Sequence, residues 1–552
     1  MKLIIREYLS LMKESEELDS MLSDLLLSMD IEPLSKPQRG VRQYGVDIAG
    51  IGIDPEDQVK KVFLFVIKQK DIDRSSWDSG PQAVRPSLNE IFDVYIQTMI
   101  SSDFKHLPKK IIVATNGDLA QTIQMNWKMY IDERRREGEI EFDFWGGDKL
   151  SILIQEYLFN EYLFPQYAQS YLRKTLAFID LNDYDLSHYF KLIDETLFQR
   201  ELTKEKDRLK VIRLLHLSLN LIFLWSDNAD NLKPALLSAE RVILRVWDWL
   251  IKNNLIYNDK MVNEFLKLES TRSSINNAYF NKIQKYCYIK DGLSGYGAEE
   301  IEYPMLIFEQ IGILSIMGLD CIYKSMFFEN ERNNLIENAK VVSDALIKLI
   351  KNNKASLYPL LDGHSNDINI ALVLLFYLDK KDEMKNWLFE LINHIFLNYR
   401  FNRRFPILSD SYEELIDIEL NDLESKTESS TLIPIILEWA ILLDFEQLYV
   451  ETRDALVNIL PKLNLQIWYP DDDSENFMYH TNALYESGSM RTSIDMPENF
   501  NEFKDQVLEE KEQHGDPQKF SFFSNGYLII GLLSSRHFRT PVFPEYWRRF
   551  IT

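Results

Sequence analysis

Residues 43–70, QYGVDIAGIGIDPEDQVKKVFLFVIKQK, decide the fold that the sequence predicts. The segments 44–51 and 62–70 are rich in β-branched and aromatic residues, and they read as two strands joined by a polar turn. Asp47 lies on the first segment, and Lys70 ends the second. A carboxylate can hold a divalent cation, and a nearby lysine can steady an attacking water and the charge that grows on phosphorus. The pair therefore predicts metal-assisted hydrolysis of a phosphodiester.

Helical and strand patterns alternate on both sides of this stretch. The expected helices are 7–28, 87–100, 119–135 and 148–158, and the further expected strands are 110–115 and 140–145. This order of elements implies a sheet covered by helices on its faces. We therefore expect an α/β domain over residues 1–162.

The strand pattern fades beyond about residue 165, where long apolar helical patterns take over. We expect a large all-α C-terminal region, made of a helical domain over 163–400 and a helical region over 401–552. The polar stretches 400–431 and 464–520 are the predicted long loops of this region, and they are candidates for docking a partner.

Composition limits the classes of function. The chain has 552 residues and a formal net charge of −24, of which −6 falls on residues 1–155 and −18 on the rest. Affinity for nucleic acid comes largely from neutralising phosphates, so this charge counts against tight binding of a polyanion by the isolated chain. The only two cysteines show no pairing pattern, which favours a reducing compartment. We expect a cytoplasmic protein with no membrane span.

Several well-defined sites are missing from the sequence. The histidines and cysteines form no cluster with zinc-ligand spacing, and no glycine-rich phosphate-binding loop follows a strand. Asp471, Asp472 and Asp473 lack the glycine and the distant glutamate of a calcium loop. These absences leave the region around Asp47 as the place where the sequence points to a reaction.

With Asp47 and the Lys70 strand, the order of N-terminal elements resembles the PD-(D/E)XK nuclease superfamily, and within it the Mrr-like restriction endonuclease group. Gly45-Val46-Asp47 matches the aspartate segment of that family, and Lys70 matches its lysine. The resemblance implies a restriction-endonuclease-like α/β domain that uses Mg²⁺ or Mn²⁺. It also implies Asp47 as a metal ligand, with an accessory acid from the first helix, either Asp19 or Glu16.

The sequence departs from the family pattern at Lys68, which occupies the first position of the (E/Q)-x-K motif. Strand alternation predicts Lys68 and Lys70 on one face, with Gln69 and Asp71 on the other. Three alternatives follow from the missing acid. In the first, the metal is held by Asp47, a helix acid and a backbone carbonyl. In the second, a bulge in the strand brings Asp71 to the metal site. In the third, the domain is a degenerate nuclease fold that binds without catalysis.

The resemblance predicts a metal-dependent DNA endonuclease, with RNA left open as a substrate, that acts in prokaryotic restriction or antiviral defence. Asp47, Lys70 and Lys68 are its expected catalytic residues. The helical region is expected to regulate, to oligomerise or to bind a partner protein. The alternative is a non-catalytic scaffold or sensor whose degenerate nuclease fold binds a protein. Arg and Lys donors suit phosphate, and the side chains expected to contact nucleic acid are Arg42, Arg74, Gln82 and Arg85.

Overall fold

The computed structural model describes most of the chain. The described residues are 2–35, 44–80, 82–159, 163–181, 184–199, 201–295, 300–408, 411–421, 428–480, 488–513, 519–540, 542–543 and 547–551, apart from the side chains of 15, 16, 35, 419, 420, 512 and 513.

The chain divides into two compact units. The first comprises Met1–Val242 and Leu255–Thr271, and the second comprises Ile243–Asn254 and Arg272–Thr552. The first unit holds an α/β region followed by helices, and the second is largely helical. This confirms the predicted fold class. The domain boundaries expected at residues 162 and 400 stay predictions.

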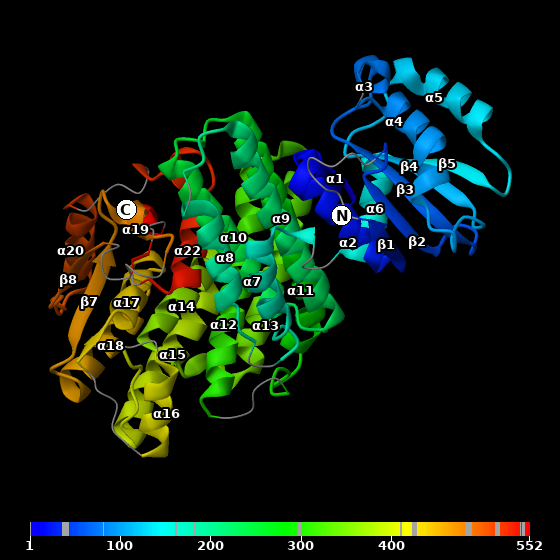
Figure 1. Cartoon of the computed structure of the whole chain (residues 1–552). Helices are drawn as coiled ribbons and strands as arrows, with labels where there is room; N and C mark the ends of the chain where they lie inside the picture. Colours follow the sequence, from blue (N-terminus) through cyan, green and yellow to red (C-terminus); the bar gives the residue numbers. More distant parts are fainter. Residues whose placement is uncertain are drawn as a thin grey trace. The chain divides into compact units, whose positions relative to one another are not determined.

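A mixed five-stranded sheet forms the centre of the α/β region (Figure 1). The strands follow one another in space as they do in the chain, the first three pairing antiparallel and the last three parallel. They are β1 (Ile31–Ser35), β2 (Ile48–Ile53), β3 (Lys60–Lys68), β4 (Lys109–Thr115) and β5 (Ile140–Trp145). The last two strands match the predicted ones within a residue, whereas β1 was not predicted because Pro33 interrupts its sequence.

Helices cover both faces of this sheet (Figure 1). One face packs on α3 (Arg74–Asp78), α4 (Val84–Glu90) with its continuation η2 (Ile91–Met99), and α5 (Gln121–Arg134). Leu64 and Val66 of β3 face that layer and pack in one core with Trp77 and Leu88. The other face is covered by α1 (Lys2–Leu9), η1 (Glu14–Leu18), α2 (Asp19–Ser28), α6 (Gly147–Leu153) and η3 (Ile154–Leu158).

The single helix predicted over 7–28 is interrupted in the structure. Helix α1 ends at Leu9, and the next helical turn is η1, a short π-helix that runs into α2. The interruption allows the carbonyl groups of Leu9 and Met12 to accept hydrogen bonds from the side chain of Asn116. Hydrogen bonds from Asn116, which is remote in sequence, therefore accompany a break in a helix that the local apolar pattern predicts as continuous.

The remaining helices of the first unit are α7 (Gln166–Leu176), α8 (Ser187–Phe198) and α9 (Glu205–Asn228). Helices α10 (Lys233–Lys252) and α11 (Asp259–Cys287) each cross a boundary between the units. The contacts of α9 with α1 belong entirely to the first unit.

The second unit consists mainly of helices packed around α12 (Glu302–Phe327). The other long ones are α13 (Arg332–Asn352), α14 (Ser365–Tyr377), α15 (Lys381–Asn402), α16 (Tyr412–Leu420), α17 (Leu432–Leu442), α18 (Glu446–Ile459), α20 (Phe500–Gln513) and α22 (Ile529–Phe538). The short ones are η5 (Glu329–Glu331), η6 (Lys354–Leu357), η7 (Asp362–His364), α19 (Ser474–Phe477), α21 (Ser521–Ser524) and η10 (Arg548–Phe550).

Parts of the stretches read as loops are ordered into a small three-stranded sheet. Its strands are β6 (Ser429–Ser430), β7 (Asn464–Tyr469) and β8 (Ser489–Thr492). The alternating side chains Leu465, Ile467 and Tyr469 of β7 are buried. That period-two alternation was the available strand signal. The reading of 464–520 as one long loop is therefore wrong for β7, β8, α19 and α20, and the reading of 400–431 as a loop is wrong for α16 and β6.

Two of the described helices, α9 and α12, are long and apolar enough to cross a membrane. In their most apolar windows, 61% of the residues of α9 and 78% of those of α12 are buried inside the protein. Burial on all sides is typical of core helices, which have the same composition. The absence of a membrane span stays a prediction.

Candidate functional site

Asp47 immediately precedes β2 and is fixed against the end of β3. Its backbone N–H donates to the carbonyl of Phe65 at 2.8 Å, and its Oδ2 accepts from the backbone N–H of Ile67 at 2.7 Å. The carboxylate is thus held half-buried at the end of the sheet where strands β3 and β4 terminate. Ligands of open α/β sheets bind at the carboxyl ends of the strands. The predicted strand 44–51 included Asp47, whereas β2 begins at Ile48, and the role of Asp47 as a site residue stays a prediction.

Gly45 accounts for the position of Asp47. Its φ is +80°, a left-handed conformation that side chains disfavour. A Cβ atom at this position would lie 2.1 Å from the carbonyl oxygen of Ser87 in α4. Only glycine lets the chain approach α4 this closely before it enters β2.

The surroundings of Asp47 shift the pKa of its carboxyl group in opposite directions. Burial raises the pKa of Asp47, the hydrogen bond from Ile67 and the Lys68 ammonium lower it, and the Glu14 carboxylate raises it. The net shift is upward. Glu14, Asp47 and Lys68 therefore form one electrostatic group. A cation placed between two carboxylates would favour their charged forms.

The structure places Glu14, at the start of η1, within electrostatic reach of Asp47. Of the two acids expected to accompany Asp47, Asp19 begins α2, and the side chain of Glu16 lies outside the described residues. Sequence reasoning did not identify Glu14, because it assumed one continuous helix through this region. The roles expected for Asp19 and Glu16 stay predictions.

Lys68 and Lys70 lie in different surroundings. Lys68 is the half-buried last residue of β3 and pairs with Thr115 of β4. Lys70 is exposed beyond the strand with a φ of +71°, and its N–H donates to Asn116 Oδ1 at 2.8 Å. Strand alternation therefore does not extend to Lys70. Asp71 is exposed and accepts a hydrogen bond from the backbone N–H of Asp118 at 2.8 Å.

Asn116 and Gln69 tie the α1–η1 connection to the ends of the strands. The Asn116 amide donates to the carbonyls of Leu9 at 2.8 Å and Met12 at 3.1 Å, and Gln69 Nε2 donates to the same Met12 carbonyl at 2.6 Å. Because Glu14 follows Met12 by two residues, these bonds help to position it. An asparagine that closes a buried strand was the one local signal for this connection.

The side chains expected to contact nucleic acid are described in part. Arg74 and Gln82 are exposed, and Arg85 is exposed with Nη1 at 3.2 Å from Asp78 Oδ2. Arg42 lies outside the described residues. Their predicted contacts with phosphate stay predictions.

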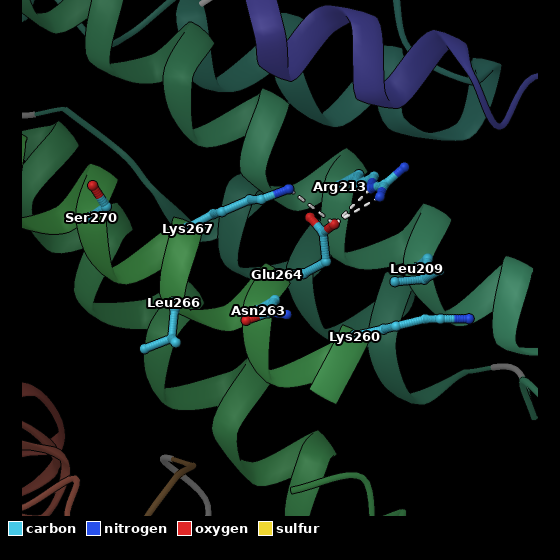
Figure 2. A pocket seen from close by; sticks show the side chains of 8 residues that line it. All are labelled: Leu209, Arg213, Lys260, Asn263, Glu264, Leu266, Lys267 and Ser270. Carbon is cyan, nitrogen blue, oxygen red and sulfur yellow. Dashed lines mark hydrogen bonds and ion pairs between the residues drawn. The ribbon is translucent and has the colours of Figure 1, made fainter. Parts of the chain in front are cut away.

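Helices α9 and α11 form a groove of about 530 Å³ in the first unit, beside residues that hold α1 (Figure 2). Arg213 and Lys267 point toward Glu264 across this groove. Arg213 donates to Glu264 Oε1 through Nε at 3.0 Å and Nη2 at 2.8 Å, while its Nη1 donates to the Glu7 carbonyl at 3.0 Å. The groove therefore borders an ion-pair network attached to α1.

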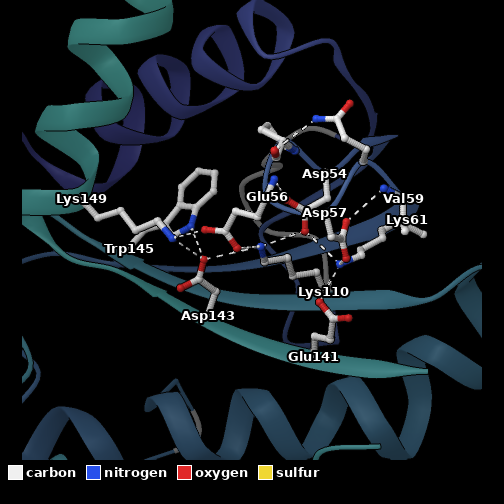
Figure 3. A network of polar contacts seen from close by, with 12 residues as sticks. Asp54, Glu56, Asp57, Val59, Lys61, Lys110, Glu141, Asp143, Trp145 and Lys149 are labelled. Carbon is white, nitrogen blue, oxygen red and sulfur yellow. Dashed lines mark hydrogen bonds and ion pairs between the residues drawn. The ribbon is translucent and has the colours of Figure 1, made fainter. Parts of the chain in front are cut away.

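A second charged cluster lies at the opposite end of the strands, where β3, β4 and β5 begin (Figure 3). It contains a triad, Asp54, Asp57 and Glu141, whose carboxylate oxygens lie within 4.8 Å of one another. Such a triad is compatible with a divalent metal ion. Among the residues that the structure describes, it is the one group of three acidic side chains close enough together to hold a metal ion.

The Lys61 ammonium lies among the three carboxylates of this triad (Figure 3). Its Nζ is 3.0 Å from Asp54 Oδ2, 2.5 Å from Asp57 Oδ2 and 2.7 Å from Glu141 Oε2. Burial alone would lower the pKa of Lys61, but the hydrogen bonds to the three acids outweigh it and hold the pKa above its ordinary value. The ammonium therefore occupies the space between the three carboxylates, and a cation would have to displace it.

The network continues through two further lysines. Lys110 Nζ lies 2.9 Å from Asp54 Oδ2 and 2.6 Å from Glu56 Oε2, and Lys149 Nζ lies 2.8 Å from both Glu56 Oε1 and Asp143 Oδ2. Alternating cations and carboxylates of this kind indicate a structural ion-pair network.

The chain matches no protein-family model, no curated protein and no solved structure. The functional argument therefore rests on the residues and their geometry.

Proposed function

We propose that the N-terminal α/β region is a Mg²⁺- or Mn²⁺-dependent nuclease that hydrolyses DNA phosphodiesters, with RNA left open. The observation that carries the proposal is the half-buried Asp47 carboxylate, fixed by Ile67 at the sheet edge and acted on by Glu14 and Lys68. The resemblance of Gly45-Val46-Asp47 and the following strand to the PD-(D/E)XK nucleases supports the same chemistry.

The donor set at Asp47 fits a hard divalent cation. Asp47 and Glu14 supply carboxylate oxygens, and the upward shift of the Asp47 pKa reflects a burial and like-charge cost that a cation would relieve. Mg²⁺ is commonly held by one or two carboxylates together with substrate phosphates and waters. Two acids therefore suffice, although β3 lacks the acid that the family motif has at the position of Lys68.

Each residue has a distinct proposed role. Asp47 and Glu14 would hold the cation, which when bound supplies an activated water and stabilises charge on phosphorus. Lys68, within electrostatic reach of Asp47, would orient the water and the phosphate oxygen. Lys70, exposed on the turn beyond β3, would contact a neighbouring phosphate.

The acidic triad is the competing location for a cation. Because the Lys61 ammonium already lies among its three carboxylates, we place the metal at Asp47. The two locations lie at opposite ends of β2 and β3, so substitutions separate them.

The helical remainder has a proposed role in control. Its strong negative charge makes it a poor surface for DNA, and it is better suited to oligomerisation or to a partner protein. By analogy with Mrr-like nucleases, we propose a cytoplasmic effector of restriction or antiviral defence in a prokaryote.

The test is cleavage of supercoiled and linear DNA in Mg²⁺ or Mn²⁺, together with the melting-temperature shift caused by the same ions. We expect Asp47→Asn to abolish both cleavage and the shift, because it removes the central ligand. Lys68→Met should reduce cleavage at least a hundredfold and leave the shift. Asp57→Asn, in the acidic triad, is the matched control and should retain both.

A different pattern would contradict the proposal. A shift lost in Asp57→Asn and kept in Asp47→Asn would place the metal at the triad. Neither cleavage nor a shift in the unmodified protein would favour the second candidate, a non-catalytic scaffold that binds a protein partner. Lys68 at the acid position, together with the engagement of Asp71 by the backbone of Asp118, is the observation that supports that candidate.

A further inference from the structure

We infer that helices α9 and α11 position Glu14 and so set the metal affinity of the Asp47 site, with Lys210 as the positioning residue nearest to it. This inference rests on the proposed function of that site. It makes the helical part of the first unit a regulator of the metal site.

Glu17 links the turn that carries Glu14 to α9. One carboxylate oxygen of Glu17, Oε2, accepts a hydrogen bond from the backbone N–H of Lys13 at 2.8 Å and so closes the start of η1. The other oxygen, Oε1, pairs with Lys210 of α9. Burial would raise the pKa of Glu17, but the hydrogen bonds from Lys210 and the Lys13 backbone outweigh it and lower the pKa. The Glu17 carboxylate is therefore charged near neutral pH.

Glu7 forms a second link, one α-helix earlier. Both of its carboxylate oxygens lie 2.7 Å from Lys267 Nζ of α11. Lys267 and Arg213 also converge on the buried Glu264, as Figure 2 shows. Because Arg213 also binds the Glu7 carbonyl, α1 is attached to α9 and α11 by side-chain and backbone contacts alike.

Residues 7–17 are consequently held from two sides. Gln69 and Asn116 fix the Met12 carbonyl from the ends of the strands, while α9 and α11 hold Glu7 and Glu17. Glu14 lies between these attachments on a short π-helix, an element that occurs mostly as single turns and frequently at functional sites. Metal affinity falls when a ligand moves away from its productive position.

The contacts of α9 and α11 with residues 7–17 therefore provide a way to control metal binding at Asp47. A displacement of these two helices would move the segment that bears Glu14. The groove of about 530 Å³ between them leaves Lys260 and Lys267 accessible beside the Glu7 attachment.

The experiment measures Mn²⁺ binding to the full chain by calorimetry. We expect Lys210→Glu to weaken binding about tenfold and the double variant Glu17→Lys/Lys210→Glu to restore it, since the reversed pair re-forms the link. Lys210→Gln should weaken binding less than Lys210→Glu and provides the measurement if the latter does not fold. Lys206→Glu is the matched control, because Lys206 is exposed on the same helix, α9, and is not one of the residues that link α9 and α11 to Glu7 and Glu17.

The outcomes distinguish the inference from the function on which it rests. Equal Mn²⁺ binding by the unmodified protein and Asp47→Asn would refute the proposed metal site. Binding that depends on Asp47 but is unchanged by the Lys210 substitutions would overturn the inference alone. Loss of binding that the double variant fails to restore, or an equal loss in Lys206→Glu, would also overturn it.

Discussion

Gly45 sets the position of the charged residue two places after it. The left-handed backbone and the approach to the Ser87 carbonyl bring the chain into β2 with Asp47 against β3. Gly138 also has a positive φ, of +73°, but no atom lies within 4 Å of where its Cβ would be. A comparison of alanine substitutions at the two glycines therefore separates the free-energy cost of the left-handed backbone from the cost of the close approach to Ser87.

We expect Gly45→Ala to lower the free energy of unfolding by more than about 2 kcal/mol. The left-handed conformation costs roughly 1–2 kcal/mol with a side chain present, and the Cβ clash with Ser87 adds to it. Gly138→Ala should cost about 1 kcal/mol, from the conformation alone. Urea denaturation of both variants gives the comparison. Equal losses would show that the approach to α4 does not matter.

Strands β3, β4 and β5 each carry part of the ion-pair network at their amino ends. Lys61 and Lys110, both nearly inaccessible, share the carboxylate of Asp54, which is 2% exposed. Charges buried to this extent are tolerated when each finds an opposite charge and hydrogen bonds. The network therefore joins the β2–β3 hairpin to the parallel part of the sheet.

Lys61→Met is expected to lower the free energy of unfolding by about 3 kcal/mol, since the buried Asp54 carboxylate loses one of its two ammonium partners while Asp57 and Glu141 lose the Lys61 ammonium as well. Without the ammonium, the triad Asp54, Asp57 and Glu141 should bind a cation. Mn²⁺ should then raise the melting temperature of this variant more than that of the unmodified protein. Lys60→Met, at the exposed first residue of β3, is the control and should stay within about 0.5 kcal/mol. A Lys61→Met variant as stable as the parent would refute the structural role of the network.

Among the described residues, each compact unit has one histidine that is buried and has a lowered pKa. In the first unit, His216 Nε2 lies 2.7 Å from Thr271 Oγ1, and burial lowers its pKa to about 4. In the second unit, His364 stacks on Phe308, and burial together with Arg539 lowers its pKa well below the ordinary value. Both side chains take up a proton in the unfolded chain at a higher pH than in the folded one.

The whole protein should therefore lose stability on acidification. Between about pH 6.5 and pH 4 the unfolded chain binds a proton at His216 that the folded chain does not, so stability rises with pH through this window and is lost as the pH falls. The full effect of His216 is about 3 kcal/mol. His216→Gln and His364→Phe should each flatten the dependence of the urea midpoint on pH. His106→Gln, at an exposed histidine, should leave it unchanged. Unaltered slopes in the first two variants would contradict the assignment.

The sequence by itself determined the strands β4 and β5 and the α/β class of the N-terminal region. Buried parallel strands are short apolar runs bounded by turn residues, and such runs are local. Asp47 was also identifiable, because the Gly45-Val46-Asp47 segment and the apolar strand after it are contiguous. The helical character of most of the remainder follows equally from local periodicity.

Only the tertiary structure decided which residues accompany Asp47. Asn116 holds the end of the first helix from 107 residues away, and the helix that follows the break starts at Glu14. Lys210 reaches Glu17 across 193 residues, and Lys61 reaches Glu141 across 80. Hydrogen bonds and ion pairs depend on distances of a few ångströms between side chains that folding brings together, and local hydrophobic patterns carry no information about them.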